Sequence, residues 1–308
     1  MSFNPHRLAA KKQALKLRSE ILRSVREFFF HRDYMEVETP HRIPAPIPEA
    51  HISPEVSGTW FLHTSPEICM KQMLAAGFDR IFQICRCFRR AERGARHLPE
   101  FTLLEWYAAG ADYRLLMQEC EALFGHVASR LGRGRVLRHQ QATINLTPPW
   151  PCRTVTEAFE TFSPISLKQA MAENRFDEIM GLHIEPNLGL DKPEFLIDYP
   201  AALGALARLK PGIPQVAERF ELYIAGMEMC NGFSELNDPA EQRRRFNAEQ
   251  RTRQRIGHPI YPIPERFLEA LSSMPDAAGN ALGFDRMVML FADARDIDSV
   301  AAFTPEDL

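Results

Sequence analysis

The chain lacks several features that mark common classes of protein. No run of about 18 apolar residues occurs in its 308 residues, and its first residues contain no apolar segment of the signal-peptide kind. Among the six cysteines, no C-x-x-C pair lies near further ligands at a zinc spacing. We therefore expect a cytoplasmic protein with no membrane partner and with reduced cysteines. Cys85 and Cys87 fall on one face of a predicted strand, and we interpret them as buried free thiols.

Two common nucleotide-binding motifs are also absent. Neither G-x-G-x-x-G nor G-x-x-x-x-G-K-[ST] occurs, so any ATP must be held by side chains rather than by a Rossmann or P-loop turn. The 37 basic residues are outnumbered by 40 acidic ones, which gives a net charge of −3 and no domain-wide basic field. A tRNA partner is therefore not expected.

The residues that are present predict one large core. The composition is 45% hydrophobic and 25% charged, which favours a single domain over residues 1–308. Apolar residues at helical intervals predict a long amphipathic helix from Pro5 to Tyr34, followed by a strand that stops at Pro40. Weak signals over residues 132–193 are interpreted as an insertion between two halves of this domain.

A hairpin is the clearest element of the middle of the chain. The strand patterns Arg80–Arg89 and Glu100–Ala109 are joined by a charged loop, which predicts an antiparallel pair with a basic tip. Because such patterns outnumber strand-helix-strand units, we expect an α+β fold, a mostly antiparallel sheet flanked by helices. Further helices are expected at residues 66–76, 112–131, 155–161, 167–174, 177–182, 239–256, 264–273 and 286–291, and further strands at 60–63, 142–146, 195–198, 219–224 and 227–233.

The first candidate for chemistry is the hairpin segment from Phe88 to Tyr107. Arginine is a natural phosphate ligand because its planar fork donates two parallel hydrogen bonds and stays charged, and Arg89 stands where the first strand enters the loop. Phe101 offers a flat face to a purine. The alternative is an exposed basic hairpin with Phe101 in the core.

The second candidate runs from Met227 to Gln242 and contains Glu228, Glu235 and Glu241. Two carboxylates that converge across a turn suit Mg²⁺, a hard cation that is often shared with substrate phosphates. Ordinary surface glutamates around a tight turn would give the same pattern, so both interpretations stay open here.

The third candidate runs from Gly279 to Leu290. Gly279 and Gly283 permit a close approach of the backbone, and Arg286 near the start of a helix favours a phosphate. A plain glycine loop before an apolar helix is the alternative, and this segment alone does not decide between them.

Taken together and in this order, the three segments resemble the signature motifs of class II aminoacyl-tRNA synthetases. TSPEICMKQMLAAGFDRIFQICRCFR, HLPEFTLLEW and NGFSELND are similar to the lysyl type. Lysyl-tRNA synthetases carry an N-terminal anticodon-binding domain, whereas here the first signature helix begins within the first ten or so residues. We therefore expect a core without that domain. TSPE, PEFTLLEWY and MPDAAGNALGFDRMVML resemble the family of elongation factor P lysine ligases.

This resemblance implies a two-step reaction. An amino acid, lysine or (R)-β-lysine, is activated by ATP and Mg²⁺ as an aminoacyl-adenylate, and a lysine side chain of translation elongation factor P then displaces AMP. The implied catalytic residues are Arg89 at the α-phosphate and Arg286 at the γ-phosphate end, and Glu228 and Glu235 are the implied magnesium ligands. The implied ATP-binding residues are Arg89, Glu92, Phe101, Glu228, Met229, Gly283 and Arg286, and the implied amino-acid-binding residues are Ser65, Pro66, Glu67, Glu105, Tyr107, Glu235, Asn237, Glu241 and Ala281.

Three positions depart from the lysyl-tRNA synthetase pattern. Ala91 replaces the usual acidic residue, with Glu92 beside it as a substitute, and Leu98 replaces an asparagine. Ala281 replaces a glycine, as it also does in the lysine ligase paralogues, which favours that family and a pocket reshaped by one methyl group.

Two alternatives share most of these residues. One is a freestanding class II ligase that charges tRNA or forms a small amide, and the other is a non-catalytic regulatory paralogue, which would typically lose an arginine or carboxylate of the ATP site. A homodimer is expected because the first signature helix and strand of class II cores pair across a two-fold axis, with Phe28 to Phe30 as apolar surface.

Overall fold

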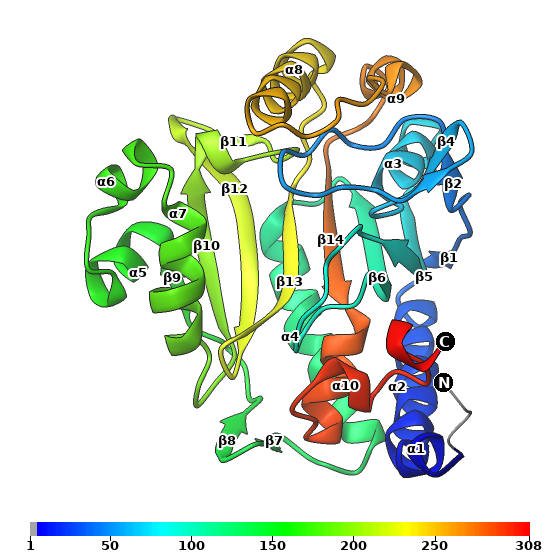
Figure 1. The fold of residues 1–308 in the computed structure, drawn as a ribbon. Helices are drawn as coiled ribbons and strands as arrows, with labels where there is room; N and C mark the ends of the chain where they lie inside the picture. The colour runs from blue at the N-terminus through cyan, green and yellow to red at the C-terminus, as the bar shows by residue number, and fades with distance from the viewer. Residues whose placement is uncertain (1–4) are drawn as a thin grey trace.

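The centre of the molecule is a nine-stranded sheet, seen in a computed structural model that describes residues 5–308 (Figure 1). Its strands follow the order β1-β5-β6-β14-β13-β12-β10-β9, with β11 beside β12, and only the β1/β5 and β9/β10 pairs are parallel. The predicted α+β class is thereby confirmed. The strands are β1 (Met35–Glu36), β5 (Arg80–Phe88), β6 (Glu100–Ala109), β9 (Cys152–Thr154), β10 (Glu194–Pro200), β11 (Leu209–Lys210), β12 (Ile213–Ile224), β13 (Met227–Ser234) and β14 (Ala277–Gly283).

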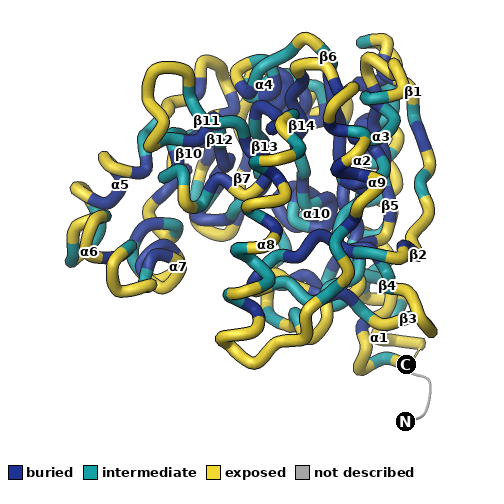
Figure 2. The backbone as a smooth tube through the Cα atoms, turned by 90° about the horizontal axis from the view of Figure 1, so that it is seen from above, coloured by how far each residue is buried: buried dark blue, intermediate teal, exposed yellow. Residues whose placement is uncertain are grey.

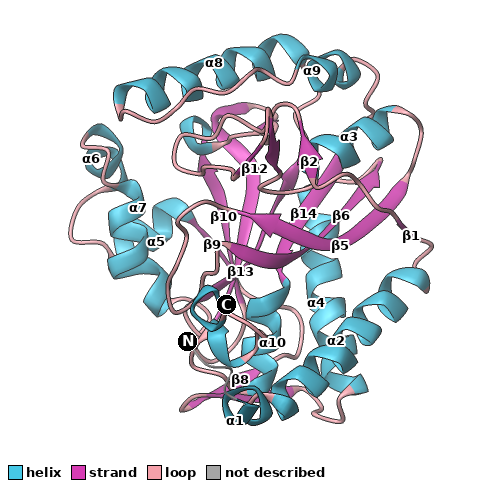
Figure 3. Cartoon of the chain, turned by 45° about the vertical axis from the view of Figure 1, so that its right-hand side comes forward, coloured by secondary structure: helices cyan, strands magenta, loops and turns pink. Residues whose placement is uncertain are grey.

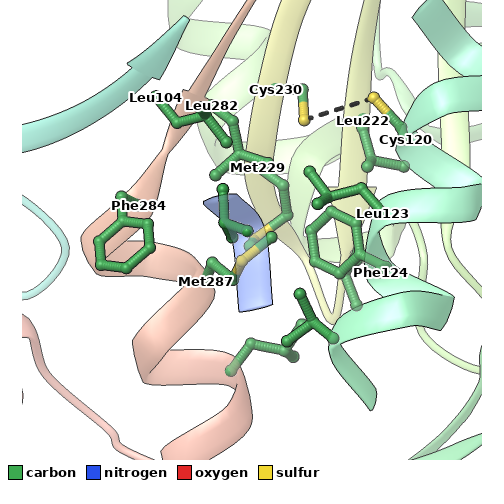
Figure 4. Packing of buried hydrophobic residues seen from close by; sticks show 14 of the residues in the cluster. Leu104, Cys120, Leu123, Phe124, Leu222, Met229, Cys230, Leu282, Phe284 and Met287 are labelled. Carbon is green, nitrogen blue, oxygen red and sulfur yellow. Dashed lines mark hydrogen bonds between the residues drawn. The ribbon is translucent and has the colours of Figure 1, made fainter. Parts of the chain in front are cut away.

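Three helices cover one face of this sheet, which we call the helix face: α2 (Lys12–Phe30), α4 (Tyr113–Arg130) and α10 (Phe284–Ala292). Alternation along β6 explains the layer, because Leu104 and Trp106 point into this core while the residues between them face the other way. Asp112 caps α4, since its carboxylate accepts hydrogen bonds from the backbone N–H groups of Arg114 and Leu115 at 2.9 and 3.2 Å. Figure 4 shows the packing between α4, α10 and the strands.

The opposite face carries α3 (Glu67–Ala75), while α8 (Pro239–Arg255) and α9 (Glu265–Leu271) lie across one end of the sheet, at the top of Figure 1. Figure 3 shows the strands as a central layer with helices on both sides. Two small sheets complete the fold. They comprise β2 (Arg42–Ile43), β3 (Val56–Ser57) and β4 (Trp60–Leu62), and the pair β7 (Val136–His139) and β8 (Ala142–Asn145).

Residues 132–193, predicted as an insertion, contribute to the main sheet as well as to its flank. β9 adds a parallel edge strand beside β10, and the following helices pack against that edge. Figure 2 shows exposed residues along the outer side of this flank. The short helices are α5 (Val155–Phe162), α6 (Leu167–Ala172) and α7 (Phe176–Ile179), with a π turn η1 (Met180–Ile184) and 3₁₀ turns η2 (Glu185–Asn187), η3 (Ala201–Leu203), η4 (Ile297–Ser299) and η5 (Pro305–Asp307).

Several predicted boundaries change in the structure. The long first helix is divided at Lys11 into α1 (Pro5–Ala10) and α2, and α1 is tied to the chain end by an ion pair between Arg7 and Asp307 at 2.8 Å. The segment before Arg286, for which a plain glycine loop was the alternative interpretation, is strand β14. None of the helices in residues 5–308 is long and apolar enough to cross a membrane.

The aromatic cluster predicted as a dimer surface is largely internal. Phe28 and Phe29 are fully buried, and Phe29 stacks on Phe82 with ring centroids 4.8 Å apart. Of the three, Phe30 remains on the surface at 52% exposed, with its ring centroid 5.6 Å from that of Phe82. The periodicity of α2 puts two of the three rings on its inner side.

Candidate active site

A cavity of about 370 Å³ opens on the face of the sheet opposite the helix face, and we call this the cavity face. Alternation along β6 directs Leu103, Glu105 and Tyr107 into it. The antiparallel register places Glu105 beside Ala281 and Tyr107 beside Gly279 on β14. A side chain at position 279 would meet the Tyr107 ring and the Glu235 carboxylate, so only glycine leaves this wall intact.

A β-bulge brings Glu228 into the same cavity. The register of β12 and β13 shifts by one residue between Leu222 and Tyr223, which leaves Met229 without an opposite partner. Without this bulge, Glu228 and Asn231 would point to opposite faces of the sheet, because their positions differ by an odd number, three. With it, both line the cavity.

One end of the cavity, which we call the phosphate end, is built around two arginines. The Arg89 guanidinium lies 5.0 Å from the centroid of the Phe101 ring and 3.7 Å from the Glu92 carboxylate. Its Nε is buried and has no hydrogen-bond partner. An unpaired buried donor is costly, so an anion at this position would supply the missing acceptor.

Arg286 stands in the first turn of α10 and is held from two sides. One of its N–H groups donates to the backbone carbonyl and the carboxylate of Glu228, at 2.8 and 3.1 Å. The other lies 2.6 Å from Nε2 of His97. Burial, followed by the positive charge of Arg286, lowers the pKa of His97, so a neutral imidazole accepts this bond. Gly283 lines the cavity beside the Arg286 side chain.

The other end, which we call the amine end, is a buried group of carboxylates around one lysine. The Lys71 ammonium lies 2.5 Å from a carboxylate oxygen of Glu67 and 2.5 Å from one of Glu235. Glu105 accepts a hydrogen bond from the Tyr107 hydroxyl at 3.2 Å. Two carboxylates therefore share one ammonium while the third is bonded to Tyr107 instead, and a second cation would balance this end.

Burial controls the protonation of these carboxylates. It raises the pKa of Glu105 well above its usual range and the pKa of Glu235 to about 8, with Lys71 opposing the second shift. Oε1 of Glu235 has no hydrogen-bond partner, and neither does Oδ1 of Asn231, which lines the cavity. The amine end thus offers unpaired acceptors, as the phosphate end offers an unpaired donor.

The proposed magnesium pair of Glu228 and Glu235 is wrong. Seven residues of strand at about 3.3 Å each separate them by on the order of 20 Å, so they cannot hold one ion. Glu235 is instead paired with Lys71 at the amine end. Glu221 of β12 lines the cavity with Glu228, and its oxygens accept hydrogen bonds from Arg219 and Tyr223 at 2.6 and 2.7 Å.

Four of the predicted amino-acid-binding residues do not line the cavity: Glu235, which lies beside the lining residue Gly279, and Pro66, Asn237 and Glu241. Asn237 donates to Asp276 at 3.1 Å, and the carboxylate of Glu241 is held by Arg244 and Arg245 on the surface of α8. These pairs, Arg244 first, lower the pKa of Glu241 to about 2. Pro66 caps α3 beside the cavity wall without forming part of it. The chain turns away after Glu235 because α8 starts at Pro239.

Most of the predicted site residues do converge, and the structure adds several. The predicted residues that line the cavity are Ser65, Glu67, Arg89, Glu92, Phe101, Glu105, Tyr107, Glu228, Met229, Ala281, Gly283 and Arg286. Lys71, His97, Glu221 and Asn231 were not predicted. Lys71 follows Glu67 by one helical turn, which is the only signal in the sequence that could have identified it.

The comparison with known proteins agrees with this geometry. The sequence profile of the family described as "tRNA synthetases class II (D, K and N)" matches residues 5–307. The chain belongs to this family.

Individual members of the family match over almost the whole chain. A protein of Vibrio cholerae is 38% identical over 94% of this chain and 94% of its own length, and one of Edwardsiella ictaluri is 38% identical over 93% of each. A protein of Avibacterium paragallinarum is 35% identical over the full length of both. All three are named "Elongation factor P--(R)-beta-lysine ligase".

Proposed function

We propose that the protein is an ATP-dependent ligase that activates (R)-β-lysine and transfers it to a lysine side chain of elongation factor P. The observation that carries the proposal is the polarity of the cavity. A buried, unpaired N–H of Arg89 lies at one end, and at the other an unpaired carboxylate oxygen of Glu235 lies beside Gly279 of the cavity wall. A substrate with a phosphate at one end and an ammonium at the other satisfies both. The names of the relatives agree with this chemistry.

At the phosphate end, Arg89 and Arg286 neutralise the charge of ATP. The orphan Nε of Arg89 is available for the α-phosphate, where the amino-acid carboxylate attacks, and Phe101 offers its ring to the adenine. Arg286 exchanges its bonds to Glu228 and His97 for the γ-phosphate. Fixed donors at the reacting phosphate favour the transition state because they need no rearrangement as charge develops.

Mg²⁺ fits a different carboxylate pair from the one first expected. Glu221 and Glu228 lie on adjacent strands and both line the cavity, and carboxylate oxygens are the ligands that this ion prefers. We propose that they hold the ion, which would supply charge neutralisation at the phosphates. Glu235 is assigned to the amino acid instead.

At the amine end, Glu105, Tyr107 and Glu235 hold the side-chain ammonium of the substrate, and Glu67 lies near its other amine. When the substrate is absent, the Lys71 ammonium lies between Glu67 and Glu235 and pairs with both carboxylates. Ala281 lies opposite Glu105 on β14 and narrows the wall by one methyl group relative to glycine. The cavity is thereby shaped for a diamine substrate.

The proposal is tested by supplying ATP and labelled (R)-β-lysine together with purified elongation factor P or with tRNA. We expect label on the protein alone. Label on tRNA alone would favour a freestanding synthetase, and label on neither would favour a regulatory paralogue.

We also propose a homodimer formed at the edge strand β1 and helix α2. The exposed Phe30 of α2 packs on Phe82 of β5, and the exposed Met35 belongs to β1, the strand at this edge of the sheet, which offers unpaired backbone hydrogen bonds. Light scattering at micromolar concentration should give twice the mass of the chain, and a Phe30→Glu variant should lower it towards the monomer.

A further inference from the structure

A histidine and two cysteines form a compact group on the cavity face, outside the residues assigned to ATP and amino acid. Nε2 of His63 lies 4.0 Å from Sγ of Cys85 and 3.9 Å from Sγ of Cys87, and the two sulfurs are 3.9 Å apart. All three side chains are buried. Within residues 5–308, no other three histidine, cysteine or acidic side chains bring their ligand atoms within 4.8 Å of one another.

The backbone fixes this group from two directions. Cys85 and Cys87 are two residues apart on β5, so both side chains leave the strand on the cavity face. His63 follows β4 and runs beside the end of β5, where its carbonyl accepts from the N–H of Phe88 at 3.0 Å. The three side chains therefore project from backbone segments whose positions are fixed by hydrogen bonds to the main sheet.

We propose that His63, Cys85 and Cys87 bind a thiophilic metal ion of the zinc class. Zinc bonds of about 2.3 Å to sulfur and about 2.0 Å to nitrogen at tetrahedral angles require roughly 3.8 Å between sulfurs and roughly 3.6 Å between sulfur and nitrogen. The three observed separations exceed these values by less than about 0.5 Å, so small side-chain rotations close the site. Two thiolates and an imidazole are ligands that zinc and Cu⁺ prefer.

A disulfide between the two cysteines fits the geometry less well. Residues two apart on a strand have Cα atoms about 6.6 Å apart and parallel Cβ bonds, so their Cβ atoms are separated by a similar distance. A disulfide requires Cβ atoms about 3.8 Å apart. Oxidation would therefore distort β5, whereas a metal ion bridges the sulfurs at the separation that they already have.

Metal binding has a defined cost at His63. Its Nε2 also lies 2.7 Å from the carbonyl of Arg86, and its Nδ1 is buried without a partner. Coordination through Nε2 moves the ring proton to Nδ1, breaks the bond to Arg86 and releases the thiol protons. Affinity for the ion should therefore rise with pH.

The group lies next to the phosphate end of the cavity. Cys87 pairs with Phe101 in the β5/β6 register, and the guanidinium of Arg89 lies 5.0 Å from the centroid of the same Phe101 ring. An exposed histidine, His41, lies beside the group, with its ring centroid 5.1 Å from that of His63. An ion held here would stiffen the strand end from which Arg89 projects.

The test is metal binding to the full chain, measured without ATP or amino acid. The protein is stripped with a chelator, kept reduced with a phosphine, and titrated with Zn²⁺ in equilibrium dialysis and with Co²⁺ in absorption. We expect one ion per chain, a thiolate-to-Co²⁺ charge-transfer band, and a Zn²⁺-dependent rise in melting temperature.

Matched variants localise the site. Cys87→Ser and His63→Gln should each weaken Zn²⁺ binding by more than about tenfold, because each removes one ligand. Cys152→Ser removes an exposed thiol, and Cys120→Ala removes one of a second buried pair whose sulfurs are 3.8 Å apart without an imidazole (Figure 4). Both controls should bind Zn²⁺ as the unmodified chain does.

Two results would overturn the site: fewer than about 0.1 Zn²⁺ per chain, or binding that survives Cys87→Ser and His63→Gln but is lost in a control. If Cys87→Ser fails to fold, Cys85→Ser replaces it. Since no substrate is present, the outcome is independent of the proposed ligase activity.

Discussion

The ion pairs at the two ends of the cavity differ in their exposure to solvent and in how closely their partners approach. At the phosphate end, the side chains of Arg89 and Arg286 remain 27% and 18% exposed, and their carboxylate partners lie 3.7 and 3.1 Å away. At the amine end, Lys71 and Glu235 are 1% and 0% exposed and 2.5 Å apart. Partly exposed pairs are weak and easily exchanged for a ligand, whereas a buried pair cannot lose one partner without a large penalty.

This contrast separates binding of a nucleotide from selection of an amino acid. ATP brings its own charge and can displace the loose pairs of the phosphate end. A diamine substrate requires carboxylates that are desolvated and correctly positioned before it binds, because a buried ammonium needs full pairing. The amine end therefore holds desolvated carboxyl groups of raised pKa, whose ionised form a substrate ammonium would stabilise.

The largest effect is expected from breaking the amine end. Lys71→Met removes the ammonium that Glu67 and the fully buried Glu235 both contact, so unfolding should become easier by about 3 to 5 kcal/mol. Adding Glu235→Gln should restore much of the loss. Denaturant unfolding of the single and double variants measures both, and equal stability of all three proteins would refute the role of Lys71.

Next in size is the loss of a proposed phosphate ligand. Arg286→Ala should lower ATP–pyrophosphate exchange by about 10²- to 10³-fold, the cost typical of a lost transition-state donor. Arg243→Ala, which removes a surface arginine paired with Glu265, is the control. Exchange that is equal in both variants contradicts the assignment, provided that both melt as the unmodified protein does.

A smaller and more selective effect is expected at Glu105. Glu105→Gln keeps the shape and removes the charge, so amino-acid affinity should fall by about 10- to 100-fold, the range for a charged hydrogen bond. ATP affinity should not change. Calorimetry with each ligand separates the two, and Glu100→Gln on the exposed end of β6 is the matched control.

The smallest effect is a pH dependence. The pKa of Glu235 is raised to about 8, so below this pH its carboxyl is largely protonated and a cationic substrate must displace the proton. Amino-acid affinity should therefore increase about tenfold from pH 7 to pH 9. In Glu235→Gln the dependence should weaken, with the remainder due to Glu105, whose pKa burial also raises. Calorimetry in two buffers of different ionisation enthalpy should also detect the released proton, and a flat profile in the unmodified protein would contradict this pKa.

The sequence predicted what depends on local pattern. Alternation alone placed Glu105 and Tyr107 on one side of a hairpin strand, and the structure has them there. The predicted magnesium pair of Glu228 and Glu235 was wrong because the two residues are close in sequence but lie at opposite ends of an extended strand. Glu221 was missed since its approach to Glu228 requires the pairing of β12 with β13 and a bulge that no residue type announces.

Contacts between residues that are far apart in the sequence could not be predicted either. The shared face of Cys85 and Cys87 follows from their spacing, but His63 reaches them only because the loop after β4 runs beside β5. Likewise, Phe28 and Phe29 were predicted as surface because the aromatic run alone does not show which side of α2 meets the sheet.

The most direct test of the account is amino-acid-dependent ATP–pyrophosphate exchange with (R)-β-lysine, α-lysine and norleucine, which has the shape of lysine without its side-chain ammonium. The account predicts exchange with a lysine isomer and none with norleucine, because only an ammonium satisfies the buried carboxylates. Exchange with norleucine as fast as with lysine, or no exchange with any of the three, would contradict it.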